Sequence, residues 1–158
     1  MRRKQPVTQR RVPVPPNANI LSTTDPKGRI TYVNDEFIEI SGFTVDELIG
    51  QPHNIIRHPD MPRQAFFEFW DALRNGRSWM GLVKNRCKNG DHYWVHAYVT
   101  PILNDSGEVV EYQSIRQAPD EKAVERAERL YAQIRATEPD SRSLRFGGKK
   151  RKENFIQN

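Results

Sequence analysis

The chain has 158 residues, of which 36% are apolar, and one cysteine, so it fits a single folded domain with extensions. No apolar run approaches the roughly 20 residues of a membrane-spanning helix, and no apolar segment follows the basic N-terminus as it would in a secretory signal. The lone Cys87 excludes an internal disulfide framework and makes a poor metal site. We therefore expect a protein of the reducing cytoplasm.

The net charge of +5 lies in the two ends of the chain. Residues 1–12 carry five basic side chains and no acidic one, and residues 141–158 carry six basic side chains against one acidic. The stretch 13–140 is consequently acidic, with a net charge of −5. A nucleic-acid-binding domain would carry a basic patch on its folded part, so we expect no nucleic-acid partner. Basic arms of this kind are typical of solvated or disordered segments, or of contact with an anionic membrane surface, here the inner face of the membrane.

The first half of the chain alternates turn signals with short periodic segments. A proline-rich lead-in has no periodicity, whereas a capping box opens one of the short helices and glycines end several of them. A polar segment, QPHNIIRHPDMP, interrupts the pattern before the longest amphipathic helix of this half. The predicted elements are strands 20–25 and 29–34 and helices 36–41, 45–49 and 62–75.

The stretch from Trp79 to Ile102 carries the strongest local signal, because Asn89-Gly90 between two runs rich in Val, Trp and Tyr predicts a β-hairpin. Alternate side chains of paired strands share a face. One face therefore carries Trp79, Gly81, Val83, Asn85, Tyr93, Val95, Ala97 and Val99. Small residues on this face leave volume, and a buried amide needs a hydrogen-bond partner. Two interpretations stay open: the face is one wall of a ligand cavity, or it packs on a helix and the amide bonds to backbone.

After the hairpin the pattern predicts one more strand at 109–116 and a final amphipathic helix capped by Asp120. The apolar stripe of this helix comprises Ala123, Val124, Ala127, Leu130, Tyr131 and Ile134. The stripe must bury either against the outer sheet face, which carries Trp94, or against a partner helix. Segregated helices and strands predict an α+β fold, an antiparallel sheet with short helices on one face. The expected divisions are a basic N-terminal extension 1–17, a folded domain 18–118, a helix within 119–138 and an unstructured basic tail 139–158.

Several single residues admit both a functional and a structural interpretation. His58 with Asp60 could be a general base and its orienter, although such a pair is more often a helix cap and a loop hydrogen bond. His92 and His96 would lie about 13 Å apart along a strand, too far to share a metal, so we expect them at the surface or an interface. Cys87 is expected to be an ordinary half-buried thiol. The sequence therefore predicts no catalytic group, no metal site and no enzyme activity.

The segments GRITYVNDEFIEISGFTVDELIGQP and GEVVEYQSIR, with the hairpin between them, resemble a PAS domain across roughly residues 18–118. PAS domains are small sensors in which short helices cradle a ligand against a five-stranded antiparallel sheet. The segments ILSTTD, QPHNIIRHPDMP, SWMGLVKNRCKNGDHYWV and SIR resemble more particularly the cytoplasmic sensory domain of bacterial aerotaxis receptors. Those domains bind FAD non-covalently and report its redox state.

The resemblance implies a set of residues that contact FAD. Trp79 would lie against the isoalloxazine ring, Asn85 would hydrogen-bond its polar edge, and Arg57 would neutralise phosphate charge. Phe66 belongs either to the core or to the pocket lining. The cofactor-binding candidates are Asn34, His53, Arg57, His58, Asp60, Phe66, Trp79, Asn85 and Tyr93.

The resemblance implies a redox or energy sensor that passes its signal, by a conformational change, to a second copy of the chain or to a downstream signalling module. Aerotaxis receptors continue into membrane segments and a signalling coiled coil, which this sequence lacks, so we expect an excised sensory domain or a free-standing PAS protein. A light-sensing flavin domain needs a reactive cysteine near Asn54, where this chain has Ile55 and Ile56. We therefore expect no photochemical adduct with the flavin. The alternatives are a haem-based gas sensor, although 62–75 contains no histidine, a cofactor-free PAS interaction or dimerisation module, and a flavin enzyme.

Overall fold

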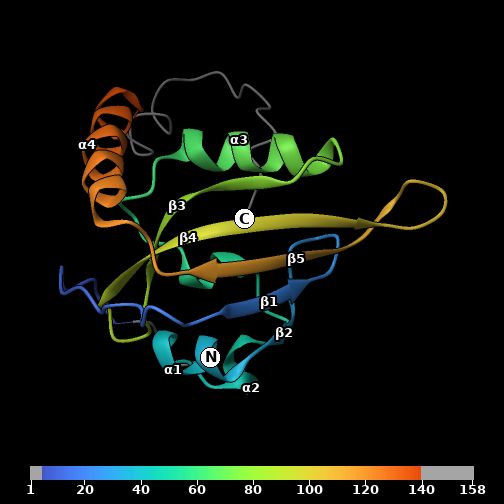
Figure 1. Ribbon diagram of the computed structural model, residues 1–158, viewed down its shortest axis with the longest axis horizontal. Helices are drawn as coiled ribbons and strands as arrows, with labels where there is room; N and C mark the ends of the chain where they lie inside the picture. Colours follow the sequence, from blue (N-terminus) through green and yellow to red (C-terminus); the bar gives the residue numbers. More distant parts are fainter. Residues whose placement is uncertain (1–4, 140–158) are drawn as a thin grey trace, which may run out of the picture.

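A five-stranded antiparallel sheet in the order β2-β1-β5-β4-β3 forms the centre of the computed structural model, which describes residues 5–139 (Figure 1). The strands are β1 (Ile20–Thr24), β2 (Ile30–Val33), β3 (Trp79–Arg86), β4 (His92–Leu103) and β5 (Val109–Gln117). The helices are α1 (Asp35–Ser41), α2 (Val45–Leu48), the 3₁₀ turn η1 (His53–Ile56), α3 (Arg63–Arg74) and α4 (Glu121–Thr137). The predicted α+β architecture is confirmed, and every predicted strand and helix lies within two residues of its expected bounds.

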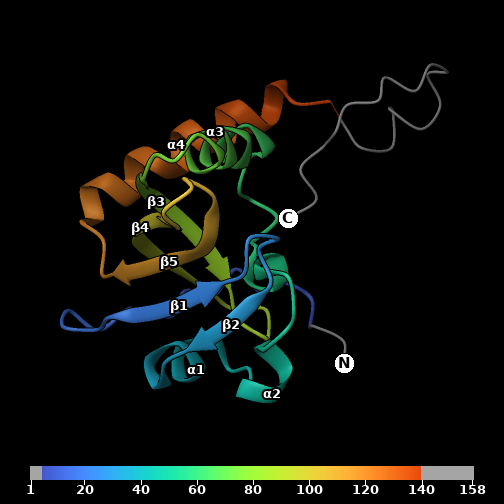
Figure 2. The same cartoon turned by 90° about the vertical axis from the view of Figure 1, so that its right-hand side faces the viewer.

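The register of the β3–β4 hairpin puts the predicted residues on one face of the sheet. Trp79 lies opposite Val99, Gly81 opposite Ala97 and Asn85 opposite Tyr93. This inner face packs against α1, α2 and η1 at one end and against α3 at the other (Figure 2). The hairpin turn requires a glycine, because Gly90 has φ +94° and a Cβ there would lie 1.9 Å from the carbonyl oxygen of Pro6.

The helix ends are fixed partly by local and partly by distant groups. Asn34 caps α1 by accepting from the amide of Phe37. No side chain of the preceding segment caps α3. Instead the carboxylate of Glu138, just beyond α4, accepts from the first two amides of α3, those of Arg63 and Gln64, both at 2.9 Å. The end of α4 therefore supports the start of α3, beside which it lies (Figures 1 and 2).

The final helix packs on the outer sheet face, one of the two predicted arrangements. Tyr131 stacks on Trp94 with ring centroids 6.1 Å apart and donates to the carbonyl of Leu82 at 2.6 Å. Val124 is buried in the same cluster. Leu130, although part of the predicted stripe, is 52% exposed, because only the Val124–Tyr131 side of the helix reaches the sheet.

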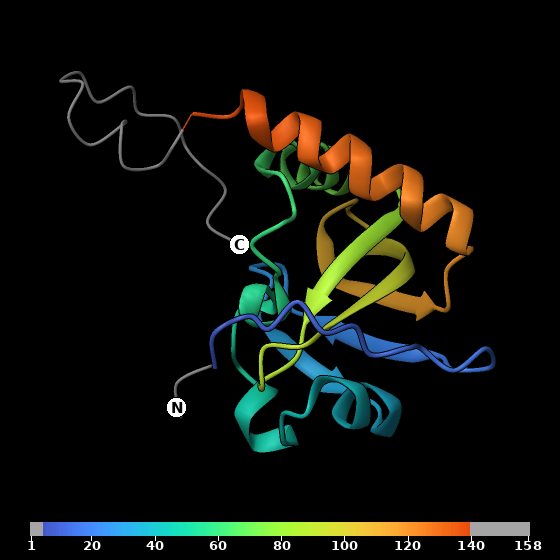
Figure 3. The same ribbon diagram turned by 90° about the vertical axis from the view of Figure 1, so that its left-hand side faces the viewer.

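The N-terminal segment 5–12 differs from the predicted solvated arm. It runs along the β3–β4 turn, where Thr8 donates to the carbonyl of Gly90 and Val12 to that of His92 (Figure 3). His92 is consequently only 5% exposed, so of its two expected positions, the surface or an interface, the surface is wrong. The other basic residues, in 1–4 and 140–158, lie outside the described residues. No helix within 5–139 is long and apolar enough to cross a membrane.

Candidate functional site

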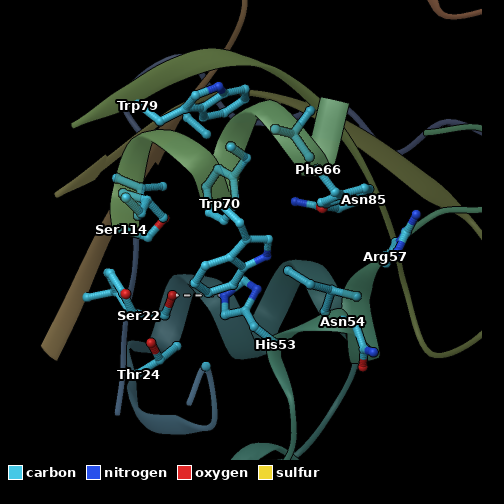
Figure 4. A pocket seen from close by; sticks show the side chains of 18 of the residues that line it. Ser22, Thr24, His53, Asn54, Arg57, Phe66, Trp70, Trp79, Asn85 and Ser114 are labelled. Carbon is cyan, nitrogen blue, oxygen red and sulfur yellow. Dashed lines mark hydrogen bonds between the residues drawn. The ribbon is translucent and has the colours of Figure 1, made fainter. Parts of the chain in front are cut away.

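A cavity of ≈ 100 Å³ lies between the inner sheet face and the segment from η1 to α3 (Figure 4). The sheet contributes residues from β1, β3, β4 and β5, and α3 contributes a row of apolar side chains that includes Phe66, Phe69 and Trp70. The aromatic rings pack edge to face, with Phe69 5.1 Å from both Trp70 and Trp79. The walls are thus mostly apolar and aromatic, with few polar groups, a composition typical of small-molecule sites.

Five of the nine predicted cofactor-binding residues line this cavity: His53, Arg57, Phe66, Trp79 and Asn85. The Arg57 guanidinium lies over the Phe66 ring, 3.9 Å from its centroid. The backbone of Arg57 also forms an antiparallel bridge with Asn85, which joins the loop after η1 to the edge strand β3. Residues far apart in the sequence are thus brought to one end of the cavity.

Asn85 differs from an ordinary core amide. The residue is 4% exposed, it lines the cavity, and its Nδ2 has no hydrogen-bond partner. The hydroxyl of Tyr93, on the directly opposite residue, also lacks a partner of regular geometry. Burial raises the pKa of this phenol, and the Asn85 side chain, which lies close enough for a weak interaction, lowers it in part. Buried polar groups normally have well-formed hydrogen bonds. Two buried polar groups without one, side by side on the inner face, therefore favour the predicted ligand-cavity wall over a closed core.

The volume expected over Gly81 is occupied by a neighbouring ring. A Cβ at this position would lie 2.8 Å from the indole of Trp79, so the indole covers the inner face of β3 there. The missing side chain lets the indole lie against its own strand. Gly81 thereby sets the position of a cavity wall without lining the cavity itself.

The other four predicted residues, Asn34, His58, Asp60 and Tyr93, are not among the residues that line the cavity. Asn34 caps α1, as described above, and also donates to the carbonyl of Asn19. His58 is fully buried and accepts at Nδ1 from the amide of Asp60, whose carboxylate pairs with Lys84 at 2.7 Å. Burial, with the nearby Lys84 cation, lowers the pKa of His58 to about 4, so its imidazole is neutral at pH 7. Here these residues hold the loop and helix around the cavity, and their contact with a cofactor stays a prediction.

A further polar group of the cavity, on β5, was not among the residues predicted from the sequence. Arg116 lines the cavity, is 4% exposed, and donates to Ser22 Oγ at 2.9 Å and His53 Nε2 at 2.6 Å. Its Nη1 has no partner, and neither has the hydroxyl of Ser114, two residues earlier on the same face. Burial lowers the pKa of Arg116 to about 10. The alternation of β5 could have indicated this position, because Tyr112, Ser114 and Arg116 share the inward register.

Comparison with known proteins agrees with this geometry. The family model described as "PAS fold" matches residues 30–116, more than half of the chain. The chain therefore belongs to the PAS family. It is 45% identical over 130 residues, 82% of its length, to the aerotaxis receptor of Escherichia coli, which confirms the resemblance found in the sequence. It is 30% identical over 97 residues to the nitrogen fixation regulatory protein of Klebsiella pneumoniae. The chain spans 26% and 20% of the lengths of these two relatives.

Solved structures show the same fold at low sequence identity. A light-oxygen-voltage domain superimposes with a TM-score of 0.64 at 18% identity, over 73% of this chain and 87% of that one. The light-state structure of the Aureochrome1 light-oxygen-voltage domain gives a TM-score of 0.62, also at 18% identity, over 74% and 91% of the two chains. At this identity the similarity establishes the fold alone.

Proposed function

We propose that this PAS domain binds FAD non-covalently in the cavity and serves as a redox sensor in signal transduction of the aerotaxis type. The observation that carries the proposal is the unpaired amide of Asn85 in the wall of an aromatic-lined cavity. The 45% identity to a protein named aerotaxis receptor supports the same function. A binding and switching role needs no catalytic group, so we propose that the domain is not an enzyme.

The residues present fit a flavin in their chemistry. Phe66, Trp70 and Trp79 supply flat apolar surfaces, and Asn85 supplies an amide that can pair with the polar edge of a ring. Arg57, half-buried where the loop meets β3, has the planar guanidinium that suits a phosphate. A cavity of ≈ 100 Å³ is smaller than the roughly 300 Å³ at which drug-sized ligand sites begin, so binding requires wall side chains to move apart.

FAD supplies the capacity to take up and release electrons, and the chain's own residues supply the response. In this proposal Asn85 and His53 face the ring system, and Tyr93 lies behind Asn85 as its cross-strand neighbour. Asn34, His58 and Asp60 contribute by fixing α1 and the loop after η1. A change of charge or protonation in the cavity alters the hydrogen bonds offered to Asn85, which is the kind of local event that biases a conformational equilibrium.

The structure offers a route from the cavity to α4. Met61 lines the cavity, and its sulfur accepts from the amide of Lys84. Arg135 of α4 donates to the carbonyl of Asp60, and Glu138 caps α3, whose side chains form the cavity wall. A shift of the loop or of α3 therefore changes contacts of α4. We propose α4 as the element that passes the signal to a second copy of the chain or to a downstream signalling module.

Titration of FAD into the cofactor-free protein tests this function. The wild type should take up one equivalent of FAD, with quenching of flavin fluorescence against the aromatic walls. Asn85→Leu, which removes the amide, should weaken binding by roughly ten- to a hundred-fold, as expected for a buried hydrogen bond to a ring. Gln113→Leu, an exposed position on β5, is the matched control and should bind like the wild type. Equal FAD binding by Asn85→Leu would contradict the assignment of the cavity.

A further inference from the structure

A second cavity, which we call the outer cavity, lies on the other face of the sheet, and the proposed function makes no use of it. Its volume is ≈ 220 Å³, below the roughly 300 Å³ at which drug-sized ligand sites begin, so it suits a molecule of few heavy atoms. Lys84 and Trp94, directly opposite each other on β3 and β4, form one side of it. Glu128, Tyr131 and Arg135 of α4 form the facing side, since spacings of three and four place them on one face of the helix. A molecule in the outer cavity therefore contacts the sheet and α4 together.

The sheet side of the outer cavity carries a buried hydrogen-bond donor without an acceptor. Trp94 is 2% exposed, and its Nε1 has no hydrogen-bond partner. Tyr131 stacks on the indole, but its hydroxyl is engaged with the carbonyl of Leu82. An indole nitrogen can only donate, and buried donors are normally paired. Pairing Trp94 Nε1 thus requires an acceptor that residues 5–139 do not supply.

The outer cavity also carries charges of both signs. Lys84 is 6% exposed and donates to Asp60 at 2.7 Å, which uses one of the three N–H groups of its ammonium. Arg135 donates to the carbonyl of Asp60. Glu128, by contrast, has no hydrogen-bond or ion-pair partner among residues 5–139. The outer cavity therefore offers donors on the sheet side and a carboxylate acceptor on the α4 side.

We propose that the outer cavity binds a small zwitterion, a free amino acid. The carboxylate of the amino acid accepts from Lys84 and from Trp94 Nε1, and its ammonium donates to Glu128. Hydrogen bonds between charged groups are the strong ones, and a molecule with only one of the two charges makes only part of the set. Because the amino acid joins the sheet to α4, its binding holds α4 against the sheet. The outer cavity thus gives the domain an input that does not depend on a flavin.

Titration of the purified protein with glycine, L-alanine and L-serine tests the proposal, with acetate and methylamine as probes that carry one charge each. The readout is the indole N–H signal of Trp94 in ¹⁵N–¹H NMR spectra, identified by its loss in Trp94→Phe. At least one of the three amino acids should shift this signal saturably and bind at least ten-fold more tightly than acetate or methylamine. Its binding should also slow amide hydrogen exchange in α4. The indole signals of Trp70 and Trp79, which line the inner cavity, should stay in place.

A variant of Glu128 separates recognition of the two charges. Glu128 is exposed, so Glu128→Gln removes the partner of the ammonium without disturbing the packing of α4. This variant should bind the amino acid at least ten-fold more weakly than the wild type and should bind acetate equally well. Glu125→Gln, also exposed on α4, is the matched control and should bind like the wild type. The inference is overturned if none of the three amino acids shifts the Trp94 signal, if acetate binds as tightly as they do, or if Glu128→Gln keeps wild-type affinity. None of these measurements involves FAD, so their failure leaves the proposed function standing.

Discussion

The two faces of the sheet each border a cavity, and the two cavities differ in what their polar groups do. The outer cavity, between the sheet and α4, has walls that include Lys84 and Asp60, which pair with each other at 2.7 Å. The inner cavity is mostly apolar, yet Asn85 and Arg116 in its wall have polar atoms without regular partners. On the outer face, among the described residues, Trp94 is the one residue of the cavity wall with a buried unpaired polar atom. Buried unpaired polar groups gathered on an apolar wall therefore distinguish the proposed flavin site.

The largest expected effect comes from closing the inner cavity. Gly81→Ile should abolish FAD uptake, because a side chain here meets the Trp79 indole within 3 Å and pushes it off the strand. Overpacking should also cost about 1–3 kcal/mol in the free energy of unfolding. Flavin retained through gel filtration and urea unfolding measure both effects. Gln113→Ile, at an exposed position on β5, is the control for the added side chain. FAD binding by Gly81→Ile at wild-type affinity would contradict the assignment of the flavin site to the inner face.

The next effect concerns acid stability. Because the folded-state pKa of His58 is about 4 against 6.5 unfolded, the unfolded chain binds more protons between these values. The contribution of His58 to the free energy of unfolding should thus be fully present above about pH 6.5. It should fall as the pH drops towards 4, by at most about 3 kcal/mol. His58→Gln should flatten that part of the profile, measured by urea unfolding at several pH values. A profile equally steep in His58→Gln would show that other groups, such as His53, dominate.

A smaller effect is expected at the link between α4 and the cavity wall. Glu138→Ala should cost about 1 kcal/mol, the usual value of a lost helix N-cap, and speed amide exchange at Arg63 and Gln64. Urea unfolding measures the loss of stability, and hydrogen exchange measures the rates at the two amides. Glu125→Ala, exposed on the same helix, is the control. If the amides of α3 exchange at wild-type rates in Glu138→Ala, α4 does not support this wall.

The smallest effect is expected at the surface. Arg11 and Glu121 form a two-point ion pair at 2.8 Å between the N-terminal segment and α4, but both side chains are solvent-exposed. Exposed ion pairs contribute little to stability. Arg11→Gln should therefore leave the midpoint of urea unfolding essentially unchanged. A clear loss would mean that the segment 5–12 stabilises the domain through this contact and not through its backbone hydrogen bonds.

Much of this architecture could be predicted from local patterns. The departures arise from contacts between residues that lie far apart in the sequence. Alternation along the hairpin and the cap at Asp120 depend on neighbouring residues, and both are confirmed. Glu138 caps a helix 75 positions away, which no local pattern indicates. His92 is buried by a segment whose composition predicted solvation.

The candidate site likewise has residues that the sequence could indicate and one that it could not. The resemblance singled out Arg57, Trp79 and Asn85, and the structure places all three in the wall of one cavity. Their contact with a cofactor stays a prediction. The resemblance did not draw attention to Arg116, because the alternation of a strand gives the face on which a residue lies and not whether its charge finds a partner.

Flavin binding in the inner cavity is tested by the absorption spectrum of the purified protein, taken before and after anaerobic reduction. We expect a yellow protein whose flavin bands bleach on reduction and return in air, with the colour lost in Gly81→Ile. A colourless wild type that acquires no flavin bands after incubation with FAD, or a red one with a Soret band, would contradict it.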